Sequence, residues 1–222
     1  MTCPRCGFYR CICKGDDMTL TLGHTKAGNW KPEGAMEQIV FPALMAAGIV
    51  PRGQLIPAEG TSQDKRVGID WIISAHDGTQ HTIAARVQWD TDYGTFTMRY
   101  RTEKGQMSEL TKRTRSVANG GAYPTLTIQA YVTQPEGVIL NAYVVGTAEL
   151  YRHVVQLADD DDIFRLCSCA SRPRWAPGGA QYIPVAITEE GRKHAGTKAT
   201  LIGHGVGVRH LRSATEGRSI WA

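Results

Sequence analysis

GIDWIISAHDGTQHTIAARVQW, residues 68–89, holds two short apolar runs on either side of an Asp-Gly pair. Both runs, Gly68–Ile73 and Thr82–Trp89, alternate in polarity, which is typical of strands. The pair Asp77-Gly78 between them is a strong signal for a hairpin turn. The stretch therefore predicts two adjacent strands, and TFTMRYR, residues 95–101, predicts a third.

Polar residues of these strands are expected on one shared face. Successive side chains of a strand point to opposite sides, so Arg86 and Gln88 lie on one face and the apolar residues of the same run on the other. We expect Asp70, on the preceding strand, to lie beside them. The third strand alternates apolar residues with a polar face that carries Arg99 and Arg101.

The flanking sequence predicts helices around a sheet. Residues 33–47 have apolar residues at helical spacing, with a kink expected at Pro42 because proline removes a backbone hydrogen bond. Residues 108–119 predict a second helix, with Ser108 as N-cap and a basic face. The remaining predictions are a basic face formed by Lys112, Arg113 and Arg115, strands at Thr125–Val132 and Val138–Gly146, and a short helix at Ala148–Leu157.

Length and composition indicate one main domain with small appendages. The 222 residues are 42% apolar and 21% charged, with no apolar run long enough to cross a bilayer and no signal-peptide pattern, so we expect a cytoplasmic protein without a membrane partner. A net charge of +4 suits a phosphate-rich partner and an ordinary solvated surface equally well. The predicted organisation is a cysteine-rich knuckle (1–16), a linker (17–32), an α/β core with a central mixed sheet flanked by helices (33–157), and an extension packed on the core that ends in a frayed tail (158–222).

Four cysteines cluster near the N-terminus in CPRCGFYRCIC, residues 3–13. In a reducing compartment this spacing favours a structural zinc ion over disulfides, since two thiolates separated by two residues wrap one tetrahedral ion. The expected ligands are Cys3, Cys6, Cys11 and Cys13. Two alternatives remain: Cys3 and Cys6 pair with Cys167 and Cys169 around the ion, or the segment is a redox-sensitive tail.

The order helix, three strands, helix, two strands, helix resembles the restriction-endonuclease-like fold of the PD-(D/E)xK superfamily over residues 33–157. That family carries an aspartate on its second core strand and an (E/Q)xK motif on its third. Asp70, in GID, matches the aspartate, and Glu37 lies where the first helix often places an accessory carboxylate. Arg86 and Gln88, in ARVQ, occupy the positions of the family's acid and lysine, so the motif is degenerate.

This departure shifts the expected chemistry from cleavage towards binding. Magnesium prefers hard oxygen ligands, and Gln88 offers only an amide carbonyl. The guanidinium of Arg86 binds phosphate well but is not a proton-transfer base. We therefore favour a nucleic-acid-binding protein, with DNA preferred to RNA, in which Arg86, Gln88, Arg99 and Arg101 face the phosphates and Lys112, Arg113 and Arg115 flank them.

Three alternatives stay open. Asp70 and Arg86 form a structural cross-strand ion pair that fixes the strand register. The protein is an enzyme, a metal-dependent endonuclease that holds Mg²⁺ with Asp70, Gln88 and Glu37. In a different class, the scaffold binds protein as an inhibitor or accessory subunit of a nucleoprotein complex in defence or anti-defence.

Overall fold

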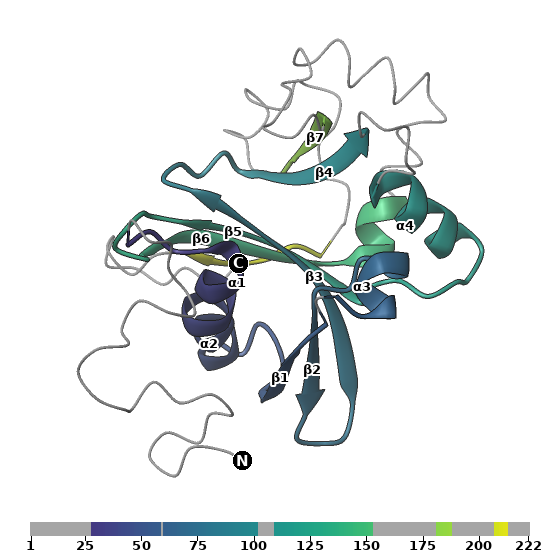
Figure 1. Cartoon of the computed structure of the whole chain (residues 1–222), viewed down its shortest axis with the longest axis horizontal. Helices are drawn as coiled ribbons and strands as arrows, with labels where there is room; N and C mark the ends of the chain where they lie inside the picture. Colours follow the sequence, from purple (N-terminus) through teal and green to yellow (C-terminus); the bar gives the residue numbers. More distant parts are fainter. Residues whose placement is uncertain (1–27, 59, 102–108, 153–180, 188–206, 213–222) are drawn as a thin grey trace.

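A six-stranded mixed sheet forms the centre of the protein (Figure 1). The computed structural model describes residues 28–58, 60–101, 109–152, 181–187 and 207–212. The strand order is β1-β2-β3-β5-β6-β8, in which β3 and β5 are parallel and the other neighbours are antiparallel. The predicted α/β class with a central mixed sheet is confirmed. The strands are β1 Gly53–Pro57, β2 Trp71–Ala75, β3 Gln80–Trp89, β5 Leu126–Val132, β6 Ile139–Gly146 and β8 Arg209–Arg212.

A long crossover joins the two parallel strands. Parallel neighbours cannot be joined by a tight turn, so the chain leaves β3, passes through β4 (Thr95–Arg101) and α4 (Glu109–Ala118), and then enters β5. The crossover places α4 on one face of the sheet, beside the short helix α3 (Ser62–Val67) (Figure 1). A hydrogen bond from Arg113 on α4 to the Gly68 carbonyl, at the end of α3, joins the two helices near the start of β2.

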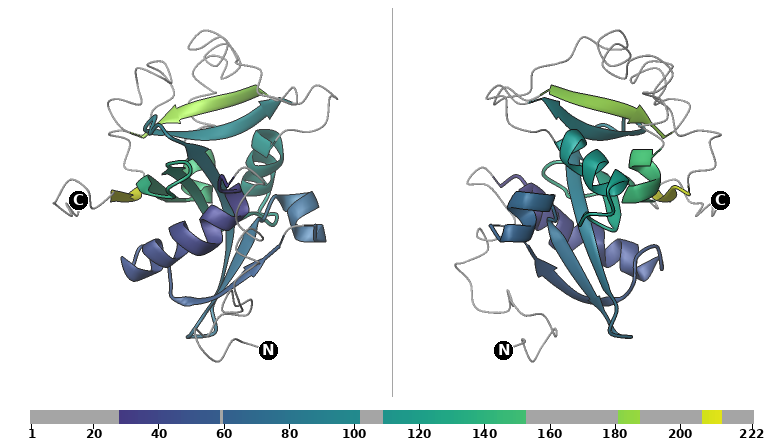
Figure 2. Two further views of the ribbon diagram at one scale, coloured as in Figure 1. Left: turned by 60° about the vertical axis from the view of Figure 1, so that its left-hand side comes forward. Right: turned by 90° about the vertical axis from the view of Figure 1, so that its right-hand side faces the viewer.

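Two strands depart from the sequence-based prediction. β4 forms where expected, but it pairs with β7 (Gln181–Ala186) in a separate two-stranded sheet that lies over the main one (Figure 2). Its apolar residues Phe96 and Met98 are buried against the face of the main sheet. The main sheet gains β1 instead, for which the sequence analysis predicted no strand; β1 is an edge strand, and this position tolerates its terminal residues Gly53 and Pro57.

The predicted N-terminal helix is present and accommodates its proline. Helical winding runs from α1 (Pro32–Ala35) through the π-helical segment η1 (Met36–Val40) into α2 (Phe41–Ala46). In η1 the Phe41 N–H donates to the Met36 carbonyl, five residues back. Proline has no N–H to donate and its ring crowds the preceding turn, so a wider turn placed just before Pro42 relieves the conflict.

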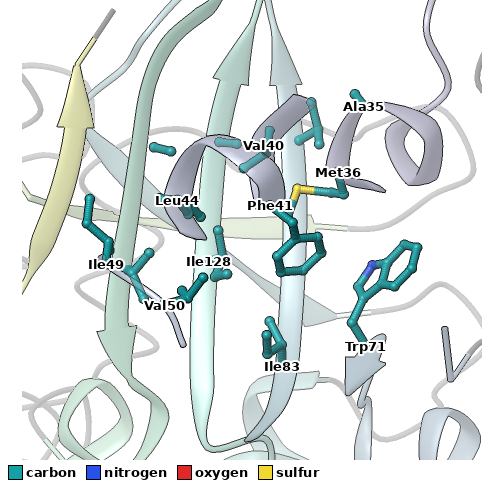
Figure 3. Close-up of a cluster of buried hydrophobic side chains, with 14 of the residues drawn as sticks. Ala35, Met36, Val40, Phe41, Leu44, Ile49, Val50, Trp71, Ile83 and Ile128 are labelled. Carbon is teal, nitrogen blue, oxygen red and sulfur yellow. The ribbon is translucent and has the colours of Figure 1, made fainter. Parts of the chain in front are cut away.

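Two apolar clusters cover the two faces of the main sheet. On one face, side chains of the N-terminal helical run pack on the sheet, with the Phe41 and Trp71 rings edge to face at 5.5 Å (Figure 3). On the other, β4 and β7 cover the sheet through a cluster that includes Phe96, Tyr131 and Tyr143. Alternation along β5 produces this arrangement, because Ile128 joins the first cluster and Tyr131 the second.

The predicted cysteine ligands, together with Cys167 and Cys169, lie outside the described residues. Of the C-terminal extension, β7 pairs with β4 and β8 pairs with β6, so its described parts form strands with the core. The helix predicted at 148–157 is helical over its described part, residues 147–152. None of the helices in the described ranges has the length and apolar character needed to cross a membrane.

Gly137, in the turn between β5 and β6, provides a test of how the helical layer docks. It has φ +71°, and a Cβ there would lie 2.6 Å from Trp30 Nε1 and 2.7 Å from Ile39 Cδ1. We expect Gly137→Ala to lower the free energy of unfolding in urea by about 2–4 kcal/mol, the sum of backbone strain and overpacking.

The matched control is Gly78→Ala. Gly78 has a similar φ of +83° but nothing within 4 Å of the added Cβ, so only the backbone cost of about 1–2 kcal/mol applies. Equal losses in the two variants would show that the close approach to Trp30 contributes nothing.

Candidate functional site

A polar cleft of about 370 Å³ lies on the face of the main sheet opposite the N-terminal helices. Its walls come from the α3–β2 connection, from α4 and from β4, and its floor comes from β3 and β5. The lining residues that carry charge are Asp64, Asp70, Arg86, Glu109, Lys112 and Arg113. The cleft is therefore the place where the predicted polar face of β3 meets residues from two helices.

Sequence spacing explains why these residues converge. Alternation along β3 turns Ala84 and Arg86 towards the cleft and Ile83 into the apolar cluster on the other side. On α4, residues three and four apart share a face, so Glu109, Lys112 and Arg113 all line the cleft.

Glu109, the first residue of α4, joins two arginines. Its Oε2 accepts from Arg86 Nη2 at 2.8 Å, and its Oε1 accepts from Arg113 Nη1. The side chains of Arg86 and Glu109 are 24% and 20% exposed, whereas that of Arg113 is 5% exposed. The bridge thus has a solvent-accessible outer pair and a buried inner pair.

Arg113 is buried although the sequence predicted an exposed basic face. Its Nη2 donates to the Gly68 carbonyl at 2.9 Å, its Nη1 donates to the Tyr151 hydroxyl at 3.3 Å, and its guanidinium lies 6.0 Å from the centre of the Tyr151 ring. Burial disfavours the charged form, but Tyr151 and Glu109 outweigh it and raise the pKa of Arg113. Burial also raises the pKa of Tyr151 to about 12, so its hydroxyl stays protonated at neutral pH.

Arg86 is held in place by β4. Its Nη1 donates to the Thr97 carbonyl at 2.8 Å and to Thr97 Oγ1 at 3.3 Å. Gln88, on the same face of β3, donates to Thr97 Oγ1 at 3.4 Å, and Gln129 on β5 accepts from the same hydroxyl at 2.9 Å. Thr97 therefore links the polar faces of β3 and β5 to β4, and it fixes one edge of the Arg86 guanidinium.

Asp70 lies immediately before β2 and lines the cleft. Its N–H donates to the Ile83 carbonyl, and its Oδ2 accepts from the Ala85 N–H, both at 2.8 Å. Burial raises the pKa of Asp70; the Ala85 hydrogen bond and the positive charge of Arg113 oppose the rise but do not cancel it. The carboxyl group is thus attached to the backbone of β3.

The structure brings some of the predicted residues together and separates others. Asp70, Arg86 and Lys112 line the cleft, and Gln88 lies beside Arg86 but outside the lining. Glu37 is exposed on η1, on the helical layer that covers the opposite face, so the structure does not bring it to the cleft. Arg115 is exposed on α4, and Arg99 and Arg101 lie at the end of β4, where only the backbone is described.

Among the residues that line the cleft, Asp64, Glu109, Thr97 and Gln129 were not predicted as site residues. Glu109 carried a usable signal, because a glutamate four residues before an arginine on a helix is a typical ion pair. Thr97 and Gln129 carried none of comparable strength, since each is one polar residue in an alternating strand.

The donor set fits a divalent cation poorly. Within the described residues no group of three or more His, Cys, Asp or Glu side chains is arranged to hold a metal ion. Both oxygens of Glu109 already accept from guanidinium groups. The cleft as it stands holds cationic side chains around carboxylates and does not form a magnesium site.

Comparisons with known proteins add no relative: no family model matches the chain, and neither the curated proteins nor the solved structures include a significant match. The geometry of the cleft is therefore the basis for a functional proposal.

The raised pKa of Asp70 makes the free energy of unfolding depend on pH. Folding raises its pKa, so the folded state binds this proton more tightly than the unfolded state, and the stabilisation is fully present below the ordinary value of 3.8. It is lost as pH rises through the higher folded-state pKa. We expect Asp70→Asn, which stays neutral and can still accept from Ala85, to gain stability relative to wild type over that rise in pH, measured by urea unfolding.

Asp77→Asn is the control of opposite sign. The pKa of Asp77 is lowered, first by the hydrogen bond from the Thr79 hydroxyl and then by that from the Thr79 N–H. The stability of wild type relative to Asp77→Asn should therefore rise as pH increases from the lowered folded-state pKa to 3.8, and should level off above that value. A stability difference between wild type and Asp70→Asn that does not change with pH contradicts the assignment.

Proposed function

We propose that the protein binds nucleic acid, preferentially DNA, on a nuclease-like scaffold, with the cleft holding a backbone phosphate. The observation that carries the proposal is Arg86: its guanidinium is partly exposed in the cleft and is fixed by Thr97. Lys112 lines the same cleft from α4. A planar guanidinium with a lysine beside it matches the geometry and charge of a phosphodiester.

The order of the strands supports the scaffold. When β1 is counted, Asp70 stands at the start of the second strand and Arg86 lies on the third, which is the arrangement that the PD-(D/E)xK resemblance implies. A helical layer precedes these strands, and α4 connects the third to the parallel β5. The scaffold resembles that superfamily in arrangement, with a degenerate motif.

Other basic residues extend the proposed contact surface. Arg115 is exposed on α4, beyond Lys112, and we propose that Arg99 and Arg101 at the end of β4 contact neighbouring phosphates. A structural zinc knuckle of the N-terminal cysteines would add a further contact. In this proposal the protein acts in the cytoplasm on nucleic acid, and a protein partner in a nucleoprotein complex is the alternative.

Fluorescence anisotropy with a labelled DNA duplex over a series of salt concentrations tests the proposal. We expect affinity to fall steeply with salt because each neutralised phosphate releases counterions. Lys112→Gln should weaken binding at every sequence and reduce the magnitude of the slope of log K against log salt by about 1.

Arg52→Gln is the matched control, since Arg52 is exposed near the start of β1 and does not line the cleft. An equal effect of the two substitutions would exclude the cleft as the phosphate site. Absence of DNA and RNA binding even at low salt would favour a protein partner.

A Mg²⁺-dependent nuclease is the second candidate, and it is favoured by two carboxylates, Asp70 and Glu109, in one cleft. Their charges interact, since Glu109 contributes to the raised pKa of Asp70. This candidate requires Glu109 to give up an arginine, because both its oxygens are engaged.

Incubation of DNA with the protein and Mg²⁺, Mn²⁺ or chelator separates the two candidates. For a binding protein we expect intact DNA under all three conditions. Metal-dependent cleavage that is lost in both Asp70→Asn and Glu109→Gln, but not in Glu37→Gln, would establish the nuclease instead.

A further inference from the structure

The Glu109 carboxylate occupies the donor edge of Arg86 that a phosphate would use. We propose that Glu109 is an internal competitor for phosphate: an incoming phosphate displaces it from Arg86, so its negative charge limits the affinity of the cleft. This inference rests on the proposed function and adds to it the residue that sets how tightly the site binds.

The exposed fractions indicate which of the two ion pairs a ligand reaches. Arg86 and Glu109 are 24% and 20% exposed, so their pair opens to the cleft, whereas Arg113 is 5% exposed and lies beneath it. A phosphate therefore meets the outer pair first. An ion pair that is partly exposed is screened by solvent more than a buried one, so a phosphate displaces the carboxylate from Arg86 more easily than it would from Arg113.

Arg86 does not need to move when the carboxylate leaves. Its Nη1 stays bound to Thr97, at 2.8 Å from the carbonyl oxygen, and its Nη2 keeps its direction towards the cleft. Arginine binds phosphate and carboxylate with the same planar fork of donors. A phosphate oxygen thus takes the position of Glu109 Oε2 on a guanidinium that is already oriented.

Glu109 also retains a partner in the displaced state. Its Oε1 accepts from the buried Arg113, independently of the oxygen that Arg86 uses. The carboxylate can therefore turn away from Arg86 without leaving the Arg113 charge uncompensated, which would be costly in a buried site. The inner pair serves as the anchor and the outer pair as the exchangeable contact.

Within the described part of the chain, two donors in the lining of the cleft have no acceptor. Arg113 Nε and Gln129 Nε2 are buried and have no hydrogen-bond partner among the described residues. The Gln129 amide is oriented by Thr97, whose N–H and hydroxyl both donate to its Oε1, so its nitrogen is the atom left over. Unused donors near an arginine favour a ligand with several acceptor oxygens, such as phosphate.

A double-mutant cycle on the full chain tests the inference, with a labelled DNA duplex as the probe. We expect Glu109→Gln to bind about three- to tenfold more tightly than wild type and Arg86→Gln to bind more weakly. Because Glu109 acts through Arg86, the gain should disappear when Glu109→Gln is combined with Arg86→Gln. The control variant is Glu136→Gln, which removes the same charge from the turn between β5 and β6. Glu136 does not line the cleft, so this variant should bind DNA with the affinity of wild type.

The possible results distinguish the competitor role of Glu109 from the proposed binding of nucleic acid. If Arg86→Gln weakens binding but Glu109→Gln does not strengthen it, or strengthens it equally in the Arg86→Gln background, the competitor role is wrong and the phosphate site stands. If neither wild type nor Glu109→Gln binds DNA or RNA, the proposed function fails and the inference with it.

A second measurement uses the unaltered protein and so does not depend on how a variant folds. Titration with inorganic phosphate, followed by NMR of the guanidinium N–H signals, should shift the Arg86 signal and leave that of Arg113 nearly unchanged. A shift of both signals alike, or of neither, would overturn the displacement of Glu109 from Arg86.

Discussion

The buried guanidinium of Arg113 is the interaction on which the rest of this face depends. It joins α4 to the backbone at Gly68, where α3 ends, and to Tyr151 in the helical segment 147–152. A buried charge costs several kcal/mol unless it is compensated, so these contacts require a carboxylate, and Glu109 supplies it. The position of α4 over the sheet is therefore set by an electrostatic requirement as well as by apolar packing.

The carboxylate that compensates the buried charge of Arg113 also affects the cleft. Glu109 has a second oxygen, and this oxygen accepts from Arg86, whose other edge is bound to Thr97. A continuous polar chain thus runs from α4 through β3 to β4, on the face of the sheet opposite the N-terminal helices. It explains why β4 lies over the sheet face at this point and why polar side chains line the space between them.

The sequence predicted the local elements better than their partners. The strands β2, β3, β5 and β6 and the helix α4 follow from periodicity and turn residues, which are local properties. The membership of β4 in a second sheet depends on β7, more than 75 residues away, and no local pattern encodes that pairing.

The site residues show the same limit. Spacing on α4 places Glu109 and Arg113 on one face, but only the position of Tyr151 and Gly68 determines that this face is buried. Asp70 and Arg86 were found because a hairpin fixes strand register; Thr97 and Gln129 were not, because their role arises between sheets.

The charge balance of the cleft limits what it can bind well. Arg113 is committed to Glu109 and to buried neighbours, so the positive charge facing a ligand comes from Arg86 and Lys112. The acidic residues of the lining oppose this positive charge. They are Asp64, Asp70, whose raised pKa reflects how poorly the site solvates a carboxylate, and Glu109, whose contact with Arg86 is exchangeable. A divalent cation would have to compete with two guanidinium groups for Glu109, whereas a phosphate at Arg86 has to displace the Glu109 carboxylate. Because the second exchange breaks the partly exposed ion pair and leaves the buried one intact, this arrangement favours an anionic ligand over a metal ion.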